Sequence, residues 1–444
     1  MAWSSEQVIA LAPDASSASS GKSLGSAHKW KTLGANESCA WGSIQGSGRN
    51  PYQTCIDLSG PAFKCSCPSR KFPCKHGLGL FLILAQQPAA LTEKEVPPWA
   101  AEWLAKRTEK EEKKTKEAEK PPDPEAQAKA AAAAEKRAAS RESNVNTGLD
   151  ELGIFIADLV RAGFATLPSK PPRFWETPAA RMVDAQAPGL ARRLRSLYGI
   201  SSRGEAWPGE LLRELSLLHL IREGWGRLTS LPEGTQADLR AAIGFNLSQD
   251  AVLLQEGVHD SWIVLGQRIL GDDERLRTQR TWLAGQKSGR VALSLSFSAG
   301  SNQPFDITLV PGTTIDAELV FFPSAFPLRA LVKNRTGTPS TVEPVFQHKN
   351  ISGAIAFGAS AFAANPWIER VPFALSSVIP RADNGWRVVD TDGKWLKLDV
   401  SEDVAWTLMS LSGGHPIALA GEWDGACLYP ISAWAEGRFH RCDR

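Results

Sequence analysis

The 444-residue chain lacks several features that would assign it to a class of protein at once. Its formal net charge is only +2, so no overall field draws it onto nucleic acid or an acidic membrane. Its most apolar run, Leu78 to Ala85, is too short to span a bilayer. The first residues, Met1 to Glu6, lack the basic start and apolar stretch of a signal peptide. We therefore expect a soluble, cytoplasmic protein with no membrane partner.

Catalytic and cofactor-binding motifs are also missing. The chain has no H-E-x-x-H, no sequential Ser/His/Asp signature and no complete glycine-rich cofactor loop. Residues 20–23 (SGKS) match only the end of a phosphate-binding loop, because Ser16 stands where an earlier glycine is needed. We expect no enzyme activity. An enzyme whose residues meet only in the folded region 146–444 stays an alternative.

Cysteine is scarce and unevenly distributed. Four of the seven cysteines are scattered, with no spacing that indicates pairing: Cys39, Cys55, Cys427 and Cys442. The other three, Cys65, Cys67 and Cys74, lie with His76 in the spacing C-x-C-x(6)-C-x-H. Few thiols, three of them placed as metal ligands, indicate a reducing compartment.

The spacing of these four residues predicts one metal site. Side chains two apart on an extended segment point to the same side, so Cys65 and Cys67 can grip one ion together. Positions two apart in a helix diverge, so Cys74 and His76 should lie where the chain enters a helix. Three thiolates and one imidazole make the closed tetrahedral set of a structural Zn²⁺ site. A cluster of buried or redox-active thiols is the alternative, and Cys55 is expected to be buried rather than to bind metal.

At these four residues the sequence resembles the SWIM zinc-finger family, whose pattern is C-x-C, a variable gap, then C-x-H. The whole chain is similar to bacterial SWIM proteins with one finger near the N-terminus and a long remainder. The resemblance implies zinc binding and a role in contacting DNA or other proteins. Several bacterial members are encoded beside MoxR-type AAA+ ATPases and von Willebrand A-domain proteins, so the resemblance implies partners of these kinds.

The predicted organisation is α+β and multidomain. Residues 1–100 form an N-terminal module whose finger, about residues 36–90, should be a small zinc-stabilised ββα unit. Residues 101–145 are rich in Ala, Glu, Lys and Pro without a regular apolar stripe, which predicts a charged linker that separates the finger from the rest. Helical spacing of apolar residues predicts an α-helical region over 146–245. Residues 246–444 should be β-rich, with Trp-rich hairpins whose tryptophans serve mainly as core.

The leading functional hypothesis is a protein-interaction adaptor with structural zinc. The alternative is nucleic-acid binding through the finger, where five basic residues accompany one acid, Asp57. The basic residues are Arg49, Lys64, Arg70, Lys71 and Lys75. Three thiolates around zinc add one negative charge, so the surplus suffices for only a few phosphate contacts. The aromatic residues Tyr52, Phe63 and Phe72 are expected to form the core of the finger rather than to stack on bases.

Overall fold

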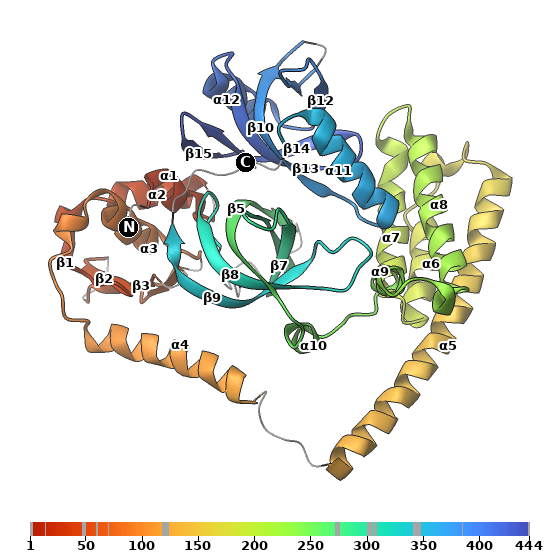
Figure 1. The fold of residues 1–444 in the computed structure, drawn as a ribbon, viewed down its shortest axis with the longest axis horizontal. Helices are drawn as coiled ribbons and strands as arrows, with labels where there is room; N and C mark the ends of the chain where they lie inside the picture. The colour runs from red at the N-terminus through yellow and green to blue at the C-terminus, as the bar shows by residue number, and fades with distance from the viewer. Residues whose placement is uncertain are drawn as a thin grey trace.

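The computed structural model describes residues 3–13, 15–46, 50–58, 61–69, 71–117, 124–270, 276–299, 305, 309–340, 348–383 and 385–442. These residues form an N-terminal finger module, a helical bundle, a five-stranded closed sheet and a six-stranded sheet (Figure 1). The α+β fold with its three kinds of region is as predicted. Among the described helices, none combines the length and the apolar content that crossing a membrane requires.

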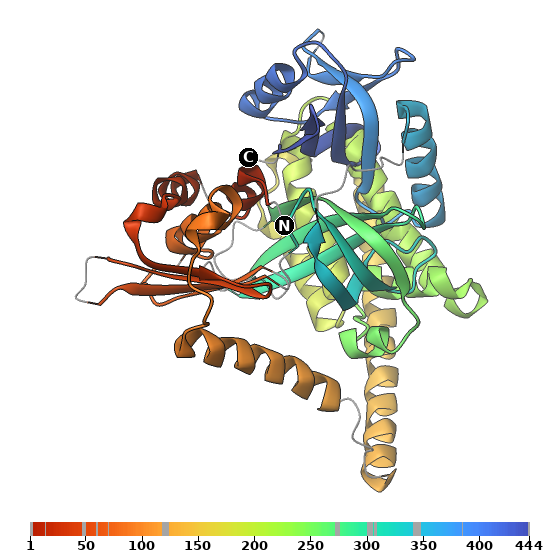
Figure 2. The ribbon, with the colours of Figure 1, turned by 60° about the vertical axis from the view of Figure 1, so that its left-hand side comes forward.

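The finger module is built on one antiparallel sheet in the order β1-β2-β3-β4. Its strands are β1 Trp30–Ala35, β2 Cys39–Ile44, β3 Tyr52–Asp57 and β4 Ala62–Cys65. Helices α1 (Ser5–Ala10), α2 (Ala15–Leu24) and α3 (Lys75–Gln86) cover one face, and α4 (Pro98–Glu117) lies across the other (Figure 2). Phe81 of α3 fills the core, with its ring 5.0 Å from Trp3 and 5.8 Å from Phe63. Strand β1 was not expected from the sequence.

Helix α4 packs on the sheet although most of its residues are polar. Trp99 and Trp103 lie over the buried pair Cys39 and Cys55. Arg107 pairs with Asp57, with Nε 3.0 Å from Oδ2. The first part of the range expected to be a linker is therefore a cover for the finger sheet.

The finger module also contacts the closed sheet. The Gln7 side-chain amide donates a 3.0 Å hydrogen bond to the carbonyl oxygen of Gly312, and Val310 belongs to the apolar core of the finger module. The expectation that the charged segment separates the finger from the rest is therefore wrong. A polar segment can separate two modules in the sequence, but the two modules can still pack against each other in the fold.

The helical bundle begins with one long helix, which runs without a break past residue 145, the expected end of the linker. Its helices are α5 Pro124–Ala162, α6 Arg173–Asp184, α7 Pro188–Ser196, α8 Trp207–Trp225 and α9 Glu233–Ile243, followed by the short α10 Gln249–Leu253. Leu149, Leu152 and Ile156, whose spacing predicts a helix, are buried in the bundle core. Arg193 donates to the Trp367 carbonyl oxygen at 3.2 Å and ties the bundle to the β-rich part.

The β-rich part contains two sheets. The five-stranded sheet runs β7-β6-β5-β8-β9, with β5 Val258–Leu270, β6 Leu276–Gly285, β7 Val291–Ala299, β8 Thr314–Phe321 and β9 Ala330–Ser340. A parallel bridge between Leu293 and Arg329 joins its two edges, so the sheet closes on itself. The hairpin β6–β7 is as predicted.

The six-stranded sheet packs against the outside of the closed sheet. Its order is β12-β11-β10-β13-β14-β15, with β10 Val371–Arg381, β11 Arg387–Val389, β12 Trp395–Leu398, β13 Ile417–Trp423, β14 Cys427–Ala435 and β15 Arg438–Arg441. Helices α11 (Ile351–Ala364) and α12 (Glu402–Ser412) pack on it. Trp423 and Trp434 are core, as expected, whereas Trp395 and Trp406 are more than half exposed. The core interpretation is therefore wrong for these two tryptophans.

Candidate zinc centre

The structure brings the four predicted ligands together from three local elements. Cys65 ends β4, Cys67 follows it, Cys74 is the N-cap residue of α3 and His76 lies in its first turn. This is the arrangement that the spacing predicts: one pair at a strand end and one pair at a helix entry. The helix is then fixed by its apolar residues, since His76 to Ile83 are all buried.

The geometry fits a tetrahedral ion. The ligand atoms of all four residues lie within 4.8 Å of one another. The His76 Nδ1 atom is 3.7 Å from Cys65 Sγ and 3.9 Å from Cys74 Sγ. Zn–S bonds of about 2.3 Å and Zn–N bonds of about 2.0 Å place tetrahedral ligand atoms about 3.5 to 3.8 Å apart. Three sulfurs and one nitrogen fill the coordination shell, so the residues present suit one structural zinc.

Neighbouring groups stabilise the ligands. The Thr54 hydroxyl on β3 lies 3.2 Å from Cys65 Sγ, and Thr54 is fully buried. The backbone N–H groups of Ser69 and Gly77 interact with Cys67 and Cys74 and favour their thiolate forms. Sequence spacing did not identify Thr54, because its contact depends on the β3–β4 register, which pairs Thr54 with Cys65.

The thiols and the imidazole lie close enough to perturb one another. Hydrogen bonds with Cys65 and Cys74 lower the pKa of Cys67 well below its usual range. Burial alone would lower the pKa of His76, but hydrogen bonds with Cys65 and Cys67 raise it to about 9. Zinc requires the neutral imidazole, so its binding displaces protons and weakens as the pH falls.

The other thiols of the module are not ligands. Cys55 is completely buried on β3, on the face turned towards α4, beside Cys39 and Trp41. The neighbouring Thr54 points to the opposite face, where the zinc ligands lie. Cys55 is therefore a buried core residue, as expected.

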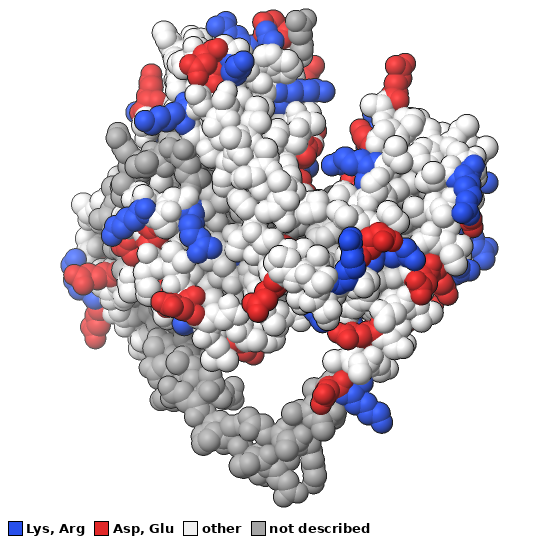
Figure 3. All heavy atoms as spheres, turned by 45° about the vertical axis from the view of Figure 1, so that its right-hand side comes forward, with Lys and Arg blue, Asp and Glu red and all other residues white. Residues whose placement is uncertain are grey.

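The basic residues expected to contact a partner are only partly described. Lys64, Lys71 and Lys75 are exposed, but Lys64 lies on the α4 face of the sheet, where its Nζ atom is 3.5 Å from the Trp99 carbonyl oxygen. Arg49 and Arg70 lie outside the described residues. Tyr52, Phe63 and Phe72 belong to the core of the module, as expected. Over the face seen in Figure 3, Lys and Arg are interspersed with Asp and Glu, in keeping with the small net charge.

The fold and the site define a protein with a structural zinc finger, a helical bundle and a β-rich body. Residues 64–85 match the family description SWIM zinc finger, and residues 140–243 match the SWIM-associated four-helix bundle domain. The chain therefore carries a SWIM zinc finger that binds one zinc ion through Cys65, Cys67, Cys74 and His76, together with its associated bundle. No curated protein and no solved structure matches the chain.

Proposed function

We propose that the protein is a non-catalytic, cytoplasmic adaptor in which zinc holds the finger in shape and the helical bundle receives a protein partner. The closed ligand set supports a structural ion, because four protein ligands leave no position for water or substrate. None of the seven cysteines, all of which lie in the described residues, forms a disulfide, which suits a reducing compartment.

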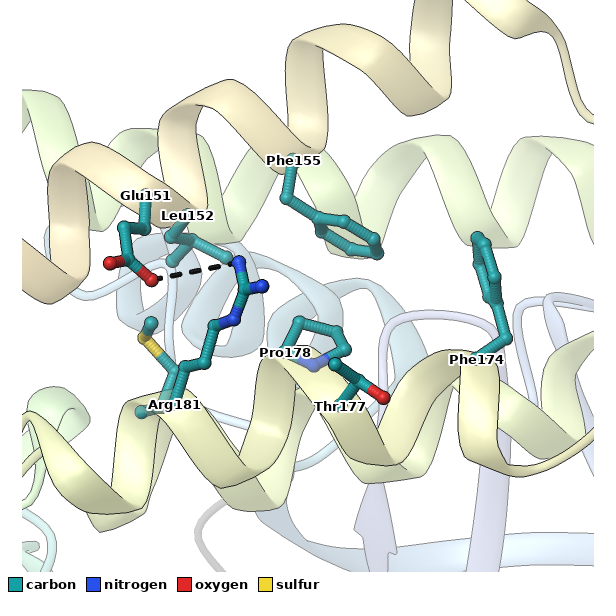
Figure 4. Close-up of a pocket in the computed structure, with 8 residues that line it drawn as sticks. Glu151, Leu152, Phe155, Phe174, Thr177, Pro178 and Arg181 are labelled. Atoms are coloured by element: carbon teal, nitrogen blue, oxygen red, sulfur yellow. Dashed lines mark ion pairs between the residues drawn. The ribbon is translucent and has the colours of Figure 1, made fainter.

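The observation that carries the partner proposal is an apolar groove between α5 and α6 (Figure 4). Its volume is about 320 Å³, at the small end of the range for ligand sites. The side chains of Phe155 and Phe174 flank one end, with ring centroids 5.9 Å apart. The ion pair of Glu151 and Arg181, with charged atoms 3.7 Å apart, lies at the other end. An apolar side chain of a partner fits the groove, and the charged pair can bind polar backbone groups beside it.

The test uses purified partners of the two kinds that the family resemblance implies: a MoxR-type AAA+ ATPase and a von Willebrand A-domain protein. Titration calorimetry with the full chain should detect binding of at least one. Phe174→Glu places a carboxylate in the groove and should weaken binding about tenfold or more. Leu212→Glu alters an exposed apolar residue of α8 elsewhere on the bundle and serves as the matched control. Binding of neither protein, or equal binding by Phe174→Glu and the wild type, would contradict the proposal.

Nucleic-acid binding through the finger is the second candidate. It is favoured by the exposure of Lys71 and Lys75 beside the zinc ligands Cys74 and His76. If these residues contact phosphates, Lys71→Glu combined with Lys75→Glu should lower the slope of log K against log salt by the amount that about two phosphate contacts with a duplex contribute. A double variant with normal zinc content and an unchanged salt dependence would exclude this role.

A further inference from the structure

The closed sheet has a topology in which one outer face often serves as a binding face. Its strands follow the order β7-β6-β5-β8-β9, and the bridge between Leu293 and Arg329 joins β7 to β9 in parallel. This is the Greek-key arrangement of the five-stranded OB-type sheet, which binds oligonucleotides or oligosaccharides over its second and third strands. These strands correspond to β6 and β7. Topology alone assigns no ligand, so the kind of ligand has to be inferred from the side chains on this face.

The outer face consists of rows of residues that run across β5, β6 and β7. The strand registers give three such rows: Leu270, Thr278 and Phe297; Arg268, Arg280 and Leu295; Gly266, Trp282 and Leu293. The row with Trp282 is buried under the six-stranded sheet. At the other end, Leu270 is 44% and Phe297 is 43% exposed. The six-stranded sheet thus leaves an apolar strip open beside a row that contains two arginines.

Among the described residues, Glu422 is the carboxylate that pairs with both arginines of this row. Arg268 and Arg280 are direct cross-strand neighbours, and like charges in this position repel. Their common partner is Glu422 of β13, which is 1% exposed. Its Oε1 atom accepts from Arg280 Nε at 2.9 Å and from Trp282 Nε1 at 2.7 Å, and its Oε2 atom accepts from Arg370 Nη1 at 3.1 Å.

Of these arginines, Arg268 has the weakest interaction with Glu422. Its Nη1 atom is 3.7 Å from Glu422 Oε2, and within the described residues its guanidinium makes no hydrogen bond. The next carboxylate, that of Asp424, accepts a 2.9 Å hydrogen bond from the hydroxyl of Tyr429. Arg268 and Arg370 lie 5.8 Å and 3.7 Å from the ring of Tyr429, and both remain partly exposed. Within the described residues, three guanidinium groups thus share the carboxylate of Glu422, Arg370 also interacts with Asp424, and Arg268 and Arg370 reach the surface.

We propose that this face binds single-stranded nucleic acid, with phosphate groups at Arg268 and Arg370 and a base on Phe297. Guanidinium groups donate to phosphate oxygens in pairs, and a phosphate would add negative charge beside Arg268 and Arg370. An exposed aromatic ring offers a stacking surface that only unpaired bases can use. A neutral oligosaccharide offers the arginines no negative charge, so nucleic acid fits this face better. The site is separate from the finger and from the α5–α6 groove.

The test is fluorescence anisotropy of a labelled 20-mer of deoxythymidine with the full, zinc-loaded chain over a series of salt concentrations. Arg268→Gln should weaken binding several-fold and reduce the slope of log K against log salt by about 0.7, the value for one single-strand phosphate contact. Phe297→Ala should weaken binding about tenfold through lost stacking, and Phe297→Leu should do the same while keeping apolar contact.

Two controls separate this site from others. Arg387→Gln removes an arginine that pairs with Asp383 and lies over Trp395 elsewhere on the six-stranded sheet, so it should leave binding unchanged. Lys71→Glu with Lys75→Glu changes the finger, and because the two sites are separate, Arg268→Gln should weaken binding by the same factor in this double variant as in the wild type. Arg268→Gln keeps all three hydrogen bonds of Glu422, so its melting temperature should stay close to that of the wild type.

Several results would overturn the proposal. These are the absence of binding at low salt, binding that Arg268→Gln and Phe297→Ala leave unchanged, and binding lost only in the finger variant. Equal affinity for a duplex of the same length would mean that Phe297 does not stack on bases. Binding of a neutral oligosaccharide that competes with the 20-mer would reassign the face.

Discussion

Removal of one zinc ligand should destabilise more than the finger, because the finger module packs on the closed sheet. Cys74 is 5% exposed and is the N-cap residue of α3, the helix that fills the core of the module. A structural zinc contributes on the order of 10 kcal/mol to the folding of a small domain, so Cys74→Ser should unfold the module and release the ion. Val310, 1% exposed, and the Gln7 to Gly312 hydrogen bond would then lose their partners.

The expected effect on the rest of the protein follows from these contacts. Exposure of one valine costs about 1.5 to 2 kcal/mol, and one hydrogen bond is worth about 1 kcal/mol. A loss of about 3 kcal/mol in the free energy of unfolding lowers the melting temperature of a domain as large as the β-rich part by about 6 to 12 °C. Scanning calorimetry and limited proteolysis of the full chain measure both effects. Cys427→Ser, which changes a thiol far from the zinc in the sequence, is the control. Coincident transitions for the β-rich part in Cys74→Ser and the wild type would refute the coupling.

Three further predictions follow from individual contacts. Thr54→Val removes the hydroxyl beside Cys65 Sγ and should weaken zinc affinity about tenfold in chelator competition, while equal affinity would mean that the contact does not tune the metal. Glu422→Gln should cost about 3 kcal/mol at neutral pH in urea denaturation. Burial alone would raise the pKa of Glu422, but Arg280, Trp282 and Arg370 lower it. The stability difference between the wild type and Glu422→Gln should therefore persist at pH values above the usual pKa of glutamate and vanish as the pH falls through the lowered pKa. A stability difference that does not depend on pH would contradict this. Trp103→Ala uncovers Cys39 and Cys55 and should speed their labelling by a maleimide, whereas an unchanged rate would place the cover elsewhere on α4.

The zinc ligands were predictable because their geometry is local. Cys65 and Cys67 lie on one extended segment, Cys74 and His76 at one helix entry, and Pro73 separates the two pairs. The hairpin turns at residues 285–289 and 424–425 were predictable for the same reason, since glycine sets both turns. The bundle helices were recognisable from apolar residues that recur at helical spacing.

Contacts between distant parts of the chain were not predictable in this way. Among the described side chains of helix α4, Trp99 and Trp103 pack on the sheet, but they stand in a charged sequence that indicates a solvated linker. The closure of the five-stranded sheet depends on a bridge between residues 293 and 329, and no local pattern encodes it. Arg268 and Glu422 are separated by more than 150 residues, and their shared cluster exists only because the two sheets pack together. The periodicity of apolar residues predicts which side of a helix or strand is buried, but not which other element that side packs against.

X-ray absorption at the zinc edge of the purified full chain tests the structural zinc centre most directly. The geometry of the four ligands predicts about one zinc per chain, with three sulfur atoms at about 2.3 Å, one nitrogen at about 2.0 Å and no water. An oxygen in the first shell would reveal an open position and contradict a purely structural ion. A sulfur count that stays at three in Cys74→Ser would contradict the assignment of Cys74 as a ligand.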